Sequence, residues 1–270
     1  MIAELLSLPF FRNAMLGVLI MSIAAGVLGS YIVARRMVSL TGGVTHACFG
    51  GLGLGYWLGI QPLLMAGVFA VASALGVEWL TWRGRAREDS AIAVVWALGM
   101  AIGVYFIFIT PGTVPELNAL LFGNILTITM ADLMAFGIFT ALLLAYTVWR
   151  FRRIEAVAFD SDFARVSGLP VRLISGVMTV FVAIGIVLMI RCVGIMLLTS
   201  MLTLPQLAAE CISRRFGRIM TLSTAISIIS SAGGLMACAH IDVPPAAFIV
   251  FIQAAIYSAA WIICRRQRRD

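Results

Sequence analysis

Long apolar runs separated by short charged segments are the feature that most limits how this chain can fold. Hydrophobic residues make up 62% of its 270 residues and charged residues only 11%, against about 45–50% and about 25% in soluble domains. At about 20 residues for each helix that crosses a bilayer, the sequence predicts an all-α, polytopic membrane bundle in a single 1–270 domain. Nine candidate spans fall near 13–34, 44–59, 63–82, 91–109, 131–149, 171–190, 193–211, 217–239 and 245–264.

The positions of the basic residues predict how this bundle is oriented. All 19 are arginines, and short cytoplasmic loops collect positive charge. With nine spans and the N-terminus outside, 17 of the 19 arginines lie in cytoplasmic segments, and only Arg12 and Arg191 lie outside. We therefore predict an outside N-terminus and a cytoplasmic C-terminus. The net charge of +7 then reflects membrane orientation, and no nucleic-acid partner is expected.

The complete absence of lysine excludes several activities. A phosphate-binding loop needs a lysine to reach the nucleotide phosphates, and Schiff-base chemistry needs a lysine amine. If ATP hydrolysis drives this protein, the ATPase site must lie on another chain. This chain is therefore expected not to be an enzyme.

The glycine-rich segment 41–55 departs most from an ordinary spanning helix. Small residues, which let another helix approach closely, recur every four positions at Ala47, Gly51, Gly55 and Gly59. His46 lies in the same run, and an ionisable side chain inside a span indicates a binding site or pathway. Neutral imidazole is also a common metal ligand. A histidine that is hydrogen-bonded to a neighbouring helix is the alternative, and the sequence leaves it equally open.

A second histidine lies in the predicted outer loop between the last two spans. In an extended loop, residues two apart point to the same side, so His240 and Asp242 could meet a cation at the outer mouth. A solvated loop histidine is the favoured alternative.

The longest cytoplasmic loop predicts a short helix near 159–168. Asp160 or Ser161 can cap its start, Gly168 can stop it, and Pro170 prevents its continuation. Its apolar face would carry Phe163, Ala164 and Val166. Because so short a helix is marginal in water unless it packs on a partner, a docking element is favoured over an ordinary connector.

Intramembrane carboxylates would favour a different class, a secondary transporter or channel that works alone and binds protons or sodium. Glu78 and Glu210 lie near predicted cytoplasmic span ends, close to arginines. Snorkelling or ion pairing accounts for both, so the stand-alone transporter is the less favoured alternative.

Several short motifs follow one another along the chain. They are Arg35-Arg36-Met37, Thr45-His46-Ala47, Glu88-Asp89-Ser90-Ala91-Ile92, Leu121-Phe122-Gly123-Asn124-Ile125-Leu126, Phe159-Asp160 with Phe163-Ala164 and Gly168-Leu169-Pro170, Val193-Gly194-Ile195-Met196-Leu197, Leu202-Thr203-Leu204-Pro205 and Asp242-Val243-Pro244-Pro245. In this order, over some 220 residues, the chain resembles the permease subunits of ATP-binding cassette importers for zinc, manganese and iron.

The resemblance implies a set of partners and a division of labour. It implies a homodimer in a bacterial inner membrane with the ion pathway between two permease copies, two cytosolic ATPase subunits that bind ATP, and an extracytoplasmic metal-binding protein. It gives the 159–168 helix the role of coupling to the ATPase, through Asp160, Asp162, Phe163, Ala164, Arg165 and Gly168. It also places His46 in the cation pathway.

One departure from the family pattern bears on the cargo. The family commonly carries an aspartate one turn before the histidine, and this chain has Gly42 there. Loss of an anionic ligand weakens binding of hard cations more than binding of a borderline ion held by imidazole. Zinc is therefore the expected cargo, with manganese, iron or a metal chelate as alternatives. Chelate permeases generally have ten spans, which favours a bare ion here.

Overall fold

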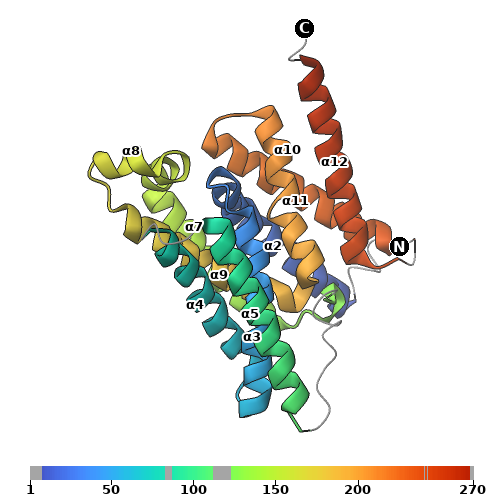
Figure 1. The fold of residues 1–270 in the computed structure, drawn as a ribbon. Coiled ribbons are helices and arrows are strands. Elements are labelled where there is room, and N and C mark those ends of the chain that lie inside the picture. Colours follow the sequence, from blue (N-terminus) through green and yellow to red (C-terminus); the bar gives the residue numbers. More distant parts are fainter. Residues whose placement is uncertain (1–7, 83–86, 112–122, 240, 242, 268–270) are drawn as a thin grey trace. The chain divides into compact units, whose positions relative to one another are not determined.

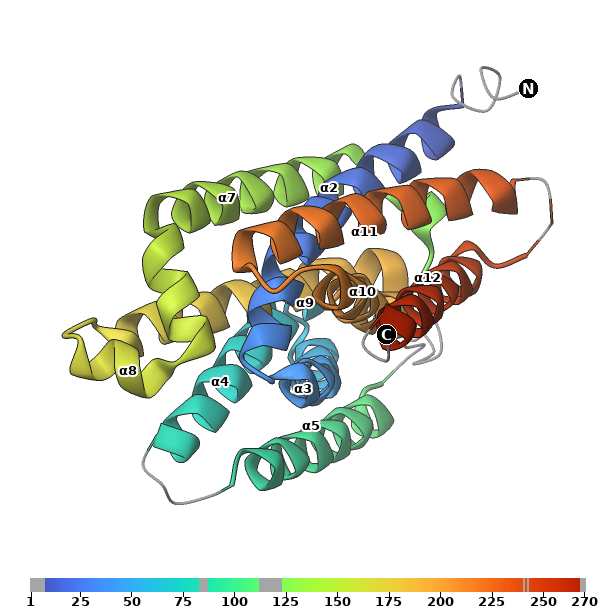
Figure 2. The same cartoon turned by 90° about the horizontal axis from the view of Figure 1, so that it is seen from above.

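The computed structural model describes residues 8–82, 87–111, 123–239, 241 and 243–267, and every regular element in these ranges is a helix. Figures 1 and 2 show long helices joined mostly by short connections. The elements are α2 (Pro9–Ala34), α3 (Val38–Leu58), α4 (Pro62–Trp82), α5 (Glu88–Ile109), the 3₁₀ turn η1 (Ile125–Thr127), α7 (Met130–Phe159), α8 (Ser161–Val166), α9 (Val171–Met201), α10 (Leu204–Ile212), α11 (Phe216–Cys238) and α12 (Pro245–Gln267). The predicted all-α class is confirmed.

Seven helical segments of the described chain are long and apolar enough to cross a membrane. One of them, Val171–Ile212, contains both α9 and α10. Helix α3 is not among the seven, because its glycines and hydroxyl residues lower its mean hydropathy. The polytopic membrane bundle is confirmed, and the number of nine spans and the orientation of the termini stay predictions.

The span predicted at 193–211 is not one continuous helix, because its helical backbone is interrupted at two places. Gly194 lies inside α9 with φ 73° and ψ 173°, a backbone conformation that favours glycine. Residues 202–203 then separate α9 from α10, so Pro205 lies in the first turn of a new helix rather than in the middle of a span. A proline is tolerated there because a first-turn amide has no partner within the helix.

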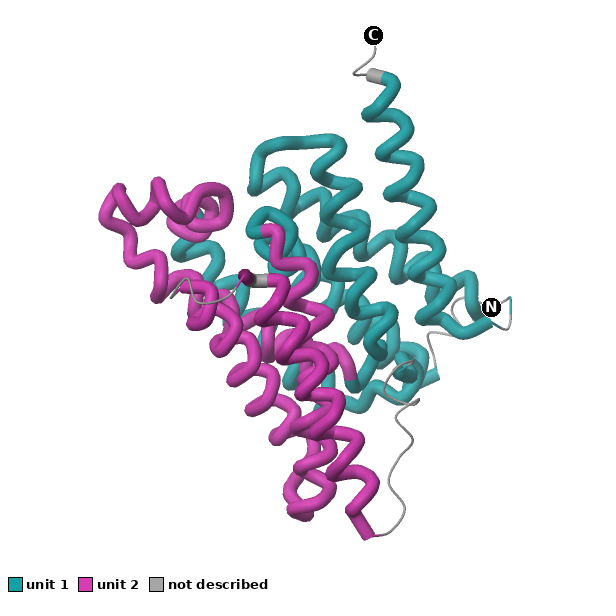
Figure 3. Tube along the Cα trace, in the orientation of Figure 1, with its two compact units in different colours: residues 1–35, 119–151, 191–270 teal, residues 36–118, 152–190 magenta. Residues whose placement is uncertain are grey.

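The chain divides into two compact units, drawn in different colours in Figure 3. The first comprises residues 1–35, 119–151 and 191–270, and the second comprises residues 36–118 and 152–190. Helices α3, α4, α5 and α8 belong to the second unit, and α2, α10, α11 and α12 belong to the first.

In the second unit, α3 packs against α4 and α5 through residues that lack bulky side chains. A Cβ atom on Gly99 of α5 would lie 2.5 Å from Ala47 Cα, and a Cβ atom on Gly51 would overlap the backbone of Met65 in α4. The stripe of small residues is therefore a packing surface. Its last member differs, because Gly59 forms the left-handed C-cap of α3 at φ 67°.

In the first unit, buried side-chain amides join the helices. Gln206 of α10 donates through Nε2 to the carbonyl oxygens of Ala25 in α2, at 2.9 Å, and of Met201, at 3.1 Å. Ser200 donates to Oε1 of Gln253 in α12 at 2.6 Å. These groups are almost fully buried, so the bonds replace those that water would otherwise make.

Candidate functional site

His46 lies in the middle of α3, in the second unit. Its ring stacks on Trp96 of α5, with 4.5 Å between the ring centroids and 5° between the ring planes. Its Nδ1 atom is buried and has no hydrogen-bond partner in the described part of the chain. The expected alternative, a histidine bonded to a neighbouring helix, therefore finds no support at Nδ1. One nitrogen of a ring held in place by Trp96 is left without a partner.

The surroundings of His46 on α3 offer space and few competing ligands. Apart from the adjoining residues and backbone of α3 itself, a Cβ atom on Gly42, one turn earlier, would find no heavy atom within 4 Å. Thr45 donates its hydroxyl to the carbonyl oxygen of Thr41 at 2.6 Å, and Cys48 donates its thiol to the carbonyl oxygen of Val44 at 3.1 Å. Both side chains are therefore turned to their own helix backbone.

The other predicted metal contacts cannot be placed. His240 and Asp242 lie outside the described residues. Within the described residues, no group of three or more His, Cys, Asp or Glu side chains could hold a metal ion. In the part of the chain that the structure describes, His46 is thus a candidate ligand that stands alone, outside any chelating cluster.

The segment predicted near 159–168 contains the short helix α8. Asp160 Oδ1 accepts hydrogen bonds from the backbone amides of Asp162, at 3.1 Å, and Phe163, at 2.9 Å, so Asp160 is the N-cap. Gly168 follows the helix with φ 79°. Residues 152–158, which precede the predicted short helix in the same loop, instead continue α7 together with Phe159, because they contain no glycine or proline and include good helix formers.

The surface of α8 differs from the apolar face predicted for it. Ala164 is fully buried, whereas 69% of Phe163 and 89% of Val166 are exposed. The helix therefore anchors itself through Ala164 and presents two apolar side chains outward. Arg165 and Asp162, at 3.6 Å, form an exposed ion pair beside them.

Trp82, the last residue of α4, receives two guanidinium groups. The Cζ atom of Arg165 in α8 lies 4.5 Å from the centroid of its ring, and that of Arg172 in α9 lies 5.4 Å away. Cation–π contacts of this kind contribute roughly 0.5–2 kcal/mol each, and these two connect α8 and α9 to the end of α4. This cluster was not predicted from the sequence, although an aromatic residue between an apolar run and a basic loop is a recognisable signal.

A second feature missed by the sequence analysis lies in the first unit. Arg191 and Asp132 form an ion pair at 3.0 Å, and Asp132 also accepts hydrogen bonds from the Thr129 amide, at 3.0 Å, and hydroxyl, at 2.7 Å. The pair joins α9 to the start of α7. Arg191 is one of the two arginines predicted outside, and its partner satisfies the charge.

Comparison with known proteins supplies the context for these features. The model of the ABC 3 transport family matches residues 7–264. A Chlamydia pneumoniae protein named probable metal transport system membrane protein is 37% identical over 268 residues, which cover 97% of this chain and 90% of its own. The manganese transport system membrane protein MntC of Halalkalibacterium halodurans is 27% identical, over 98% of this chain and 90% of its own. The solved structure of PsaBC from Streptococcus pneumoniae in complex with Fab gives a TM-score of 0.85 at 25% identity, covering 99% of this chain and 98% of that chain.

Helices of this length and apolarity, together with these relatives, define a multi-pass membrane transport protein of a bacterial inner membrane. Within that class, the chain belongs to the ABC 3 transport family, and the family match leaves out only a few residues at each end. The predicted family resemblance is confirmed.

Proposed function

We propose that this chain is the membrane-spanning permease subunit of an ATP-binding cassette importer for a divalent metal ion. The family match over residues 7–264 carries the proposal. His46 adds a chemical argument, because an unpartnered imidazole nitrogen inside a helix bundle can bind a passing cation. Relatives that are named metal and manganese transport proteins agree with that chemistry.

Zinc is the first candidate cargo. Gly42 leaves the turn before His46 without a carboxylate, and imidazole suits a borderline ion better than a hard one. Manganese is the second candidate, because the relative MntC is named for its transport.

The proposed assembly supplies two things that a single chain lacks, a second imidazole in the pathway and an ATPase site. One copy offers a single imidazole on α3, whereas two copies that face each other would bring two His46 side chains to one pathway. A chain without lysine has no phosphate-binding loop, so two cytosolic ATPase subunits would hydrolyse the ATP. An extracytoplasmic binding protein would deliver the ion to the outer mouth, where His240 and Asp242 are proposed to meet it.

The coupling element of this proposal is α8. Its outward Phe163 and Val166 would fit a groove on the ATPase, and its Arg165 contacts Trp82 at the end of α4. Closure of the ATPases on ATP would pull α8, and access to His46 would alternate between the two sides of the membrane.

Uptake of radioactive zinc by cells that express the permease with its ATPase and binding protein tests this function. We expect His46→Ala to reduce uptake at least tenfold while the subunits still copurify, and Cys48→Ala to act as the matched control on the same helix. His240→Ala and Asp242→Asn should each reduce uptake at low zinc concentration. Unchanged uptake by His46→Ala would show that this residue has no role in the ion pathway. If manganese competes with radioactive zinc more strongly than unlabelled zinc does, the cargo is manganese rather than zinc.

A further inference from the structure

Glu78 of α4 is a buried carboxylate that the proposed transport mechanism does not use. Both carboxylate oxygens are buried, and neither has a hydrogen-bond partner in the described part of the chain. The ion partner expected for Glu78, Arg83, lies outside the described residues, so that expectation stays a prediction. A buried carboxylate without a partner is costly, so a cationic group bound beside Glu78 would stabilise it.

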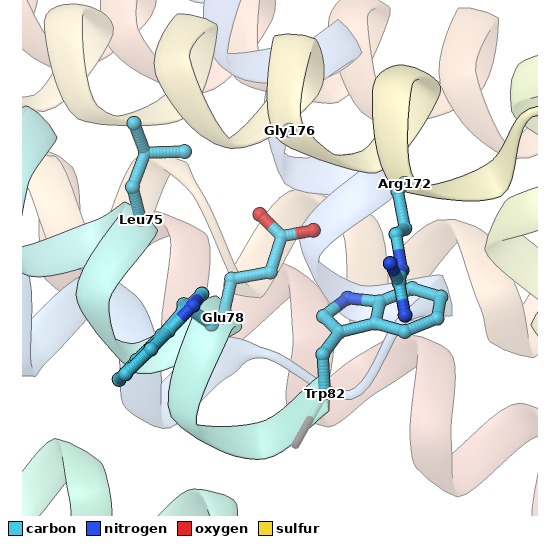
Figure 4. Close-up of a pocket in the computed structure, with 6 residues that line it drawn as sticks. Leu75, Glu78, Trp82, Arg172 and Gly176 are labelled. Carbon is cyan, nitrogen blue, oxygen red and sulfur yellow. The ribbon is translucent and has the colours of Figure 1, made fainter.

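Glu78 lines a cleft of about 390 Å³ between α4 and α9, both parts of it within the second unit. Figure 4 shows its carboxylate directed from α4 toward α9 near Gly176, with the Arg172 side chain against Trp82. The remaining lining residues are Leu75 and Trp79. A Cβ atom on Gly176 would find no heavy atom within 4 Å, so the cleft is open on the α9 side.

The charges in this cleft restrict what can occupy it. Arg172 contacts the ring of Trp82 and makes no ion pair with any described residue. A bare cation would be attracted by Glu78 but repelled by Arg172. A bare anion would be attracted by Arg172 but repelled by Glu78. The complementary occupant carries an ammonium group for Glu78 and a phosphate group for Arg172, which binds phosphate well through its planar fork.

The position of the cleft adds the third requirement. Glu78 lies one turn before Trp82, where α4 ends, and the sequence continues with Arg83, Arg85 and Arg87. Tryptophan and arginine gather at the membrane interface, at the depth of lipid headgroups. On the flank of the cleft, 37% of Leu75 and 51% of Trp79 are exposed and can contact an acyl chain.

We propose that the cleft between α4 and α9 binds the headgroup of phosphatidylethanolamine, with its ammonium on Glu78, its phosphate on Arg172 and its acyl chain along Leu75 and Trp79. The primary ammonium donates hydrogen bonds to both carboxylate oxygens. The quaternary ammonium of phosphatidylcholine has no N–H to donate, and phosphatidylglycerol has no cation. The site depends only on membrane embedding and is independent of which ion is transported.

Native mass spectrometry of the delipidated, full-length chain in detergent tests the assignment. Phosphatidylethanolamine, phosphatidylcholine and phosphatidylglycerol with identical acyl chains would be added in turn. We expect phosphatidylethanolamine to be retained several-fold more than the other two, and soluble phosphoethanolamine not to compete at equal concentration. Equal retention of the three lipids would overturn the headgroup assignment. Full competition by phosphoethanolamine would overturn the acyl contact.

Variants locate the site on the chain. Glu78→Gln should lower retention of phosphatidylethanolamine to the level of phosphatidylcholine. The control Glu155→Gln removes a carboxylate of α7 that does not line the cleft, and it should leave retention unchanged. A Cβ atom on Gly176 would meet nothing within 4 Å, so Gly176→Leu adds its volume to the cleft and should abolish the preference. Gly76→Leu, whose Cβ atom also meets nothing but which lies outside the lining, should keep it. Preserved preference in both Glu78→Gln and Gly176→Leu would overturn the proposal.

Discussion

Within each compact unit the helices approach closely at glycines, and in the described residues only the first unit also has side-chain amides that bond one helix to another. In the second unit, α3, α4 and α5 meet at Gly99, Gly103 and Gly51, where even one added carbon would overlap a neighbouring backbone. In the first unit, the amides of Gln206 and Gln253 join the helices by hydrogen bonds. Backbone contact relies on shape alone, whereas amide bonds also require a matching donor and acceptor.

The difference bears on where the candidate site lies. His46, α8 and the cleft between α4 and α9 all belong to the second unit, whose described helices meet through glycine without buried amide bonds between them. Close packing of this kind fixes the distance between α3 and its neighbours, and it leaves Gly42 and Gly176 as open positions beside the candidate sites. The second unit therefore combines a core that tolerates no added volume with surfaces that accept it.

The largest expected effect comes from adding volume where the backbones meet. A Cβ atom on Gly103 would lie 2.5 Å from the carbonyl oxygen of Phe49, so Gly103→Leu should destabilise the second unit by about 3 kcal/mol or more. Gly67→Leu is the control, since its Cβ atom would meet nothing within 4 Å. Thermal unfolding in detergent measures both, and equal midpoints would contradict packing by close contact.

A smaller loss is expected where the first unit depends on an amide. Gln206→Leu leaves the carbonyl oxygens of Ala25 and Met201 without this donor, at a cost of about 1–3 kcal/mol. The exposed Gln61 gives the control variant Gln61→Leu. If Gln206→Leu unfolds at the wild-type temperature, buried hydrogen bonds do not distinguish the two units.

The N-cap of α8 should contribute about 1 kcal/mol. Asp160→Ala removes the acceptor of two backbone amides, so hydrogen exchange at the amides of Asp162 and Phe163 should become roughly fivefold faster, since about 1 kcal/mol corresponds to that factor. Asp162→Ala removes only an exposed ion pair with Arg165 and should change exchange at Phe163 far less. Similar exchange in both variants would argue against the cap.

The smallest effect on stability is expected at Gly42. Gly42→Asp finds open space, so the unfolding midpoint should stay near that of the wild type. Because the new carboxylate favours harder cations, uptake of manganese relative to zinc should rise about tenfold, equivalent to about 1.4 kcal/mol. Gly42→Asn adds similar volume without charge, and an identical rise in that variant would assign the effect to size.

Local features of the fold could be predicted from the sequence, and contacts between distant segments could not. Apolar runs placed the long helices, and the chemistry of Asp160 and Gly168 placed the ends of α8. The stacking of Trp96 on His46 and the two guanidinium groups on Trp82 join residues far apart in the chain. Helical periodicity says which side of a helix a residue occupies, but not which neighbour it meets.

The open space at Gly42 also has an evolutionary consequence. A single base change converts a glycine codon to one for aspartate or glutamate, and a Cβ atom at this position would meet no atom of another helix within 4 Å. A lineage could therefore gain a carboxylate beside His46 in one mutational step, without compensating changes elsewhere. Ion preference in such permeases could then diverge faster than their fold, so overall sequence identity would be a poor guide to cargo.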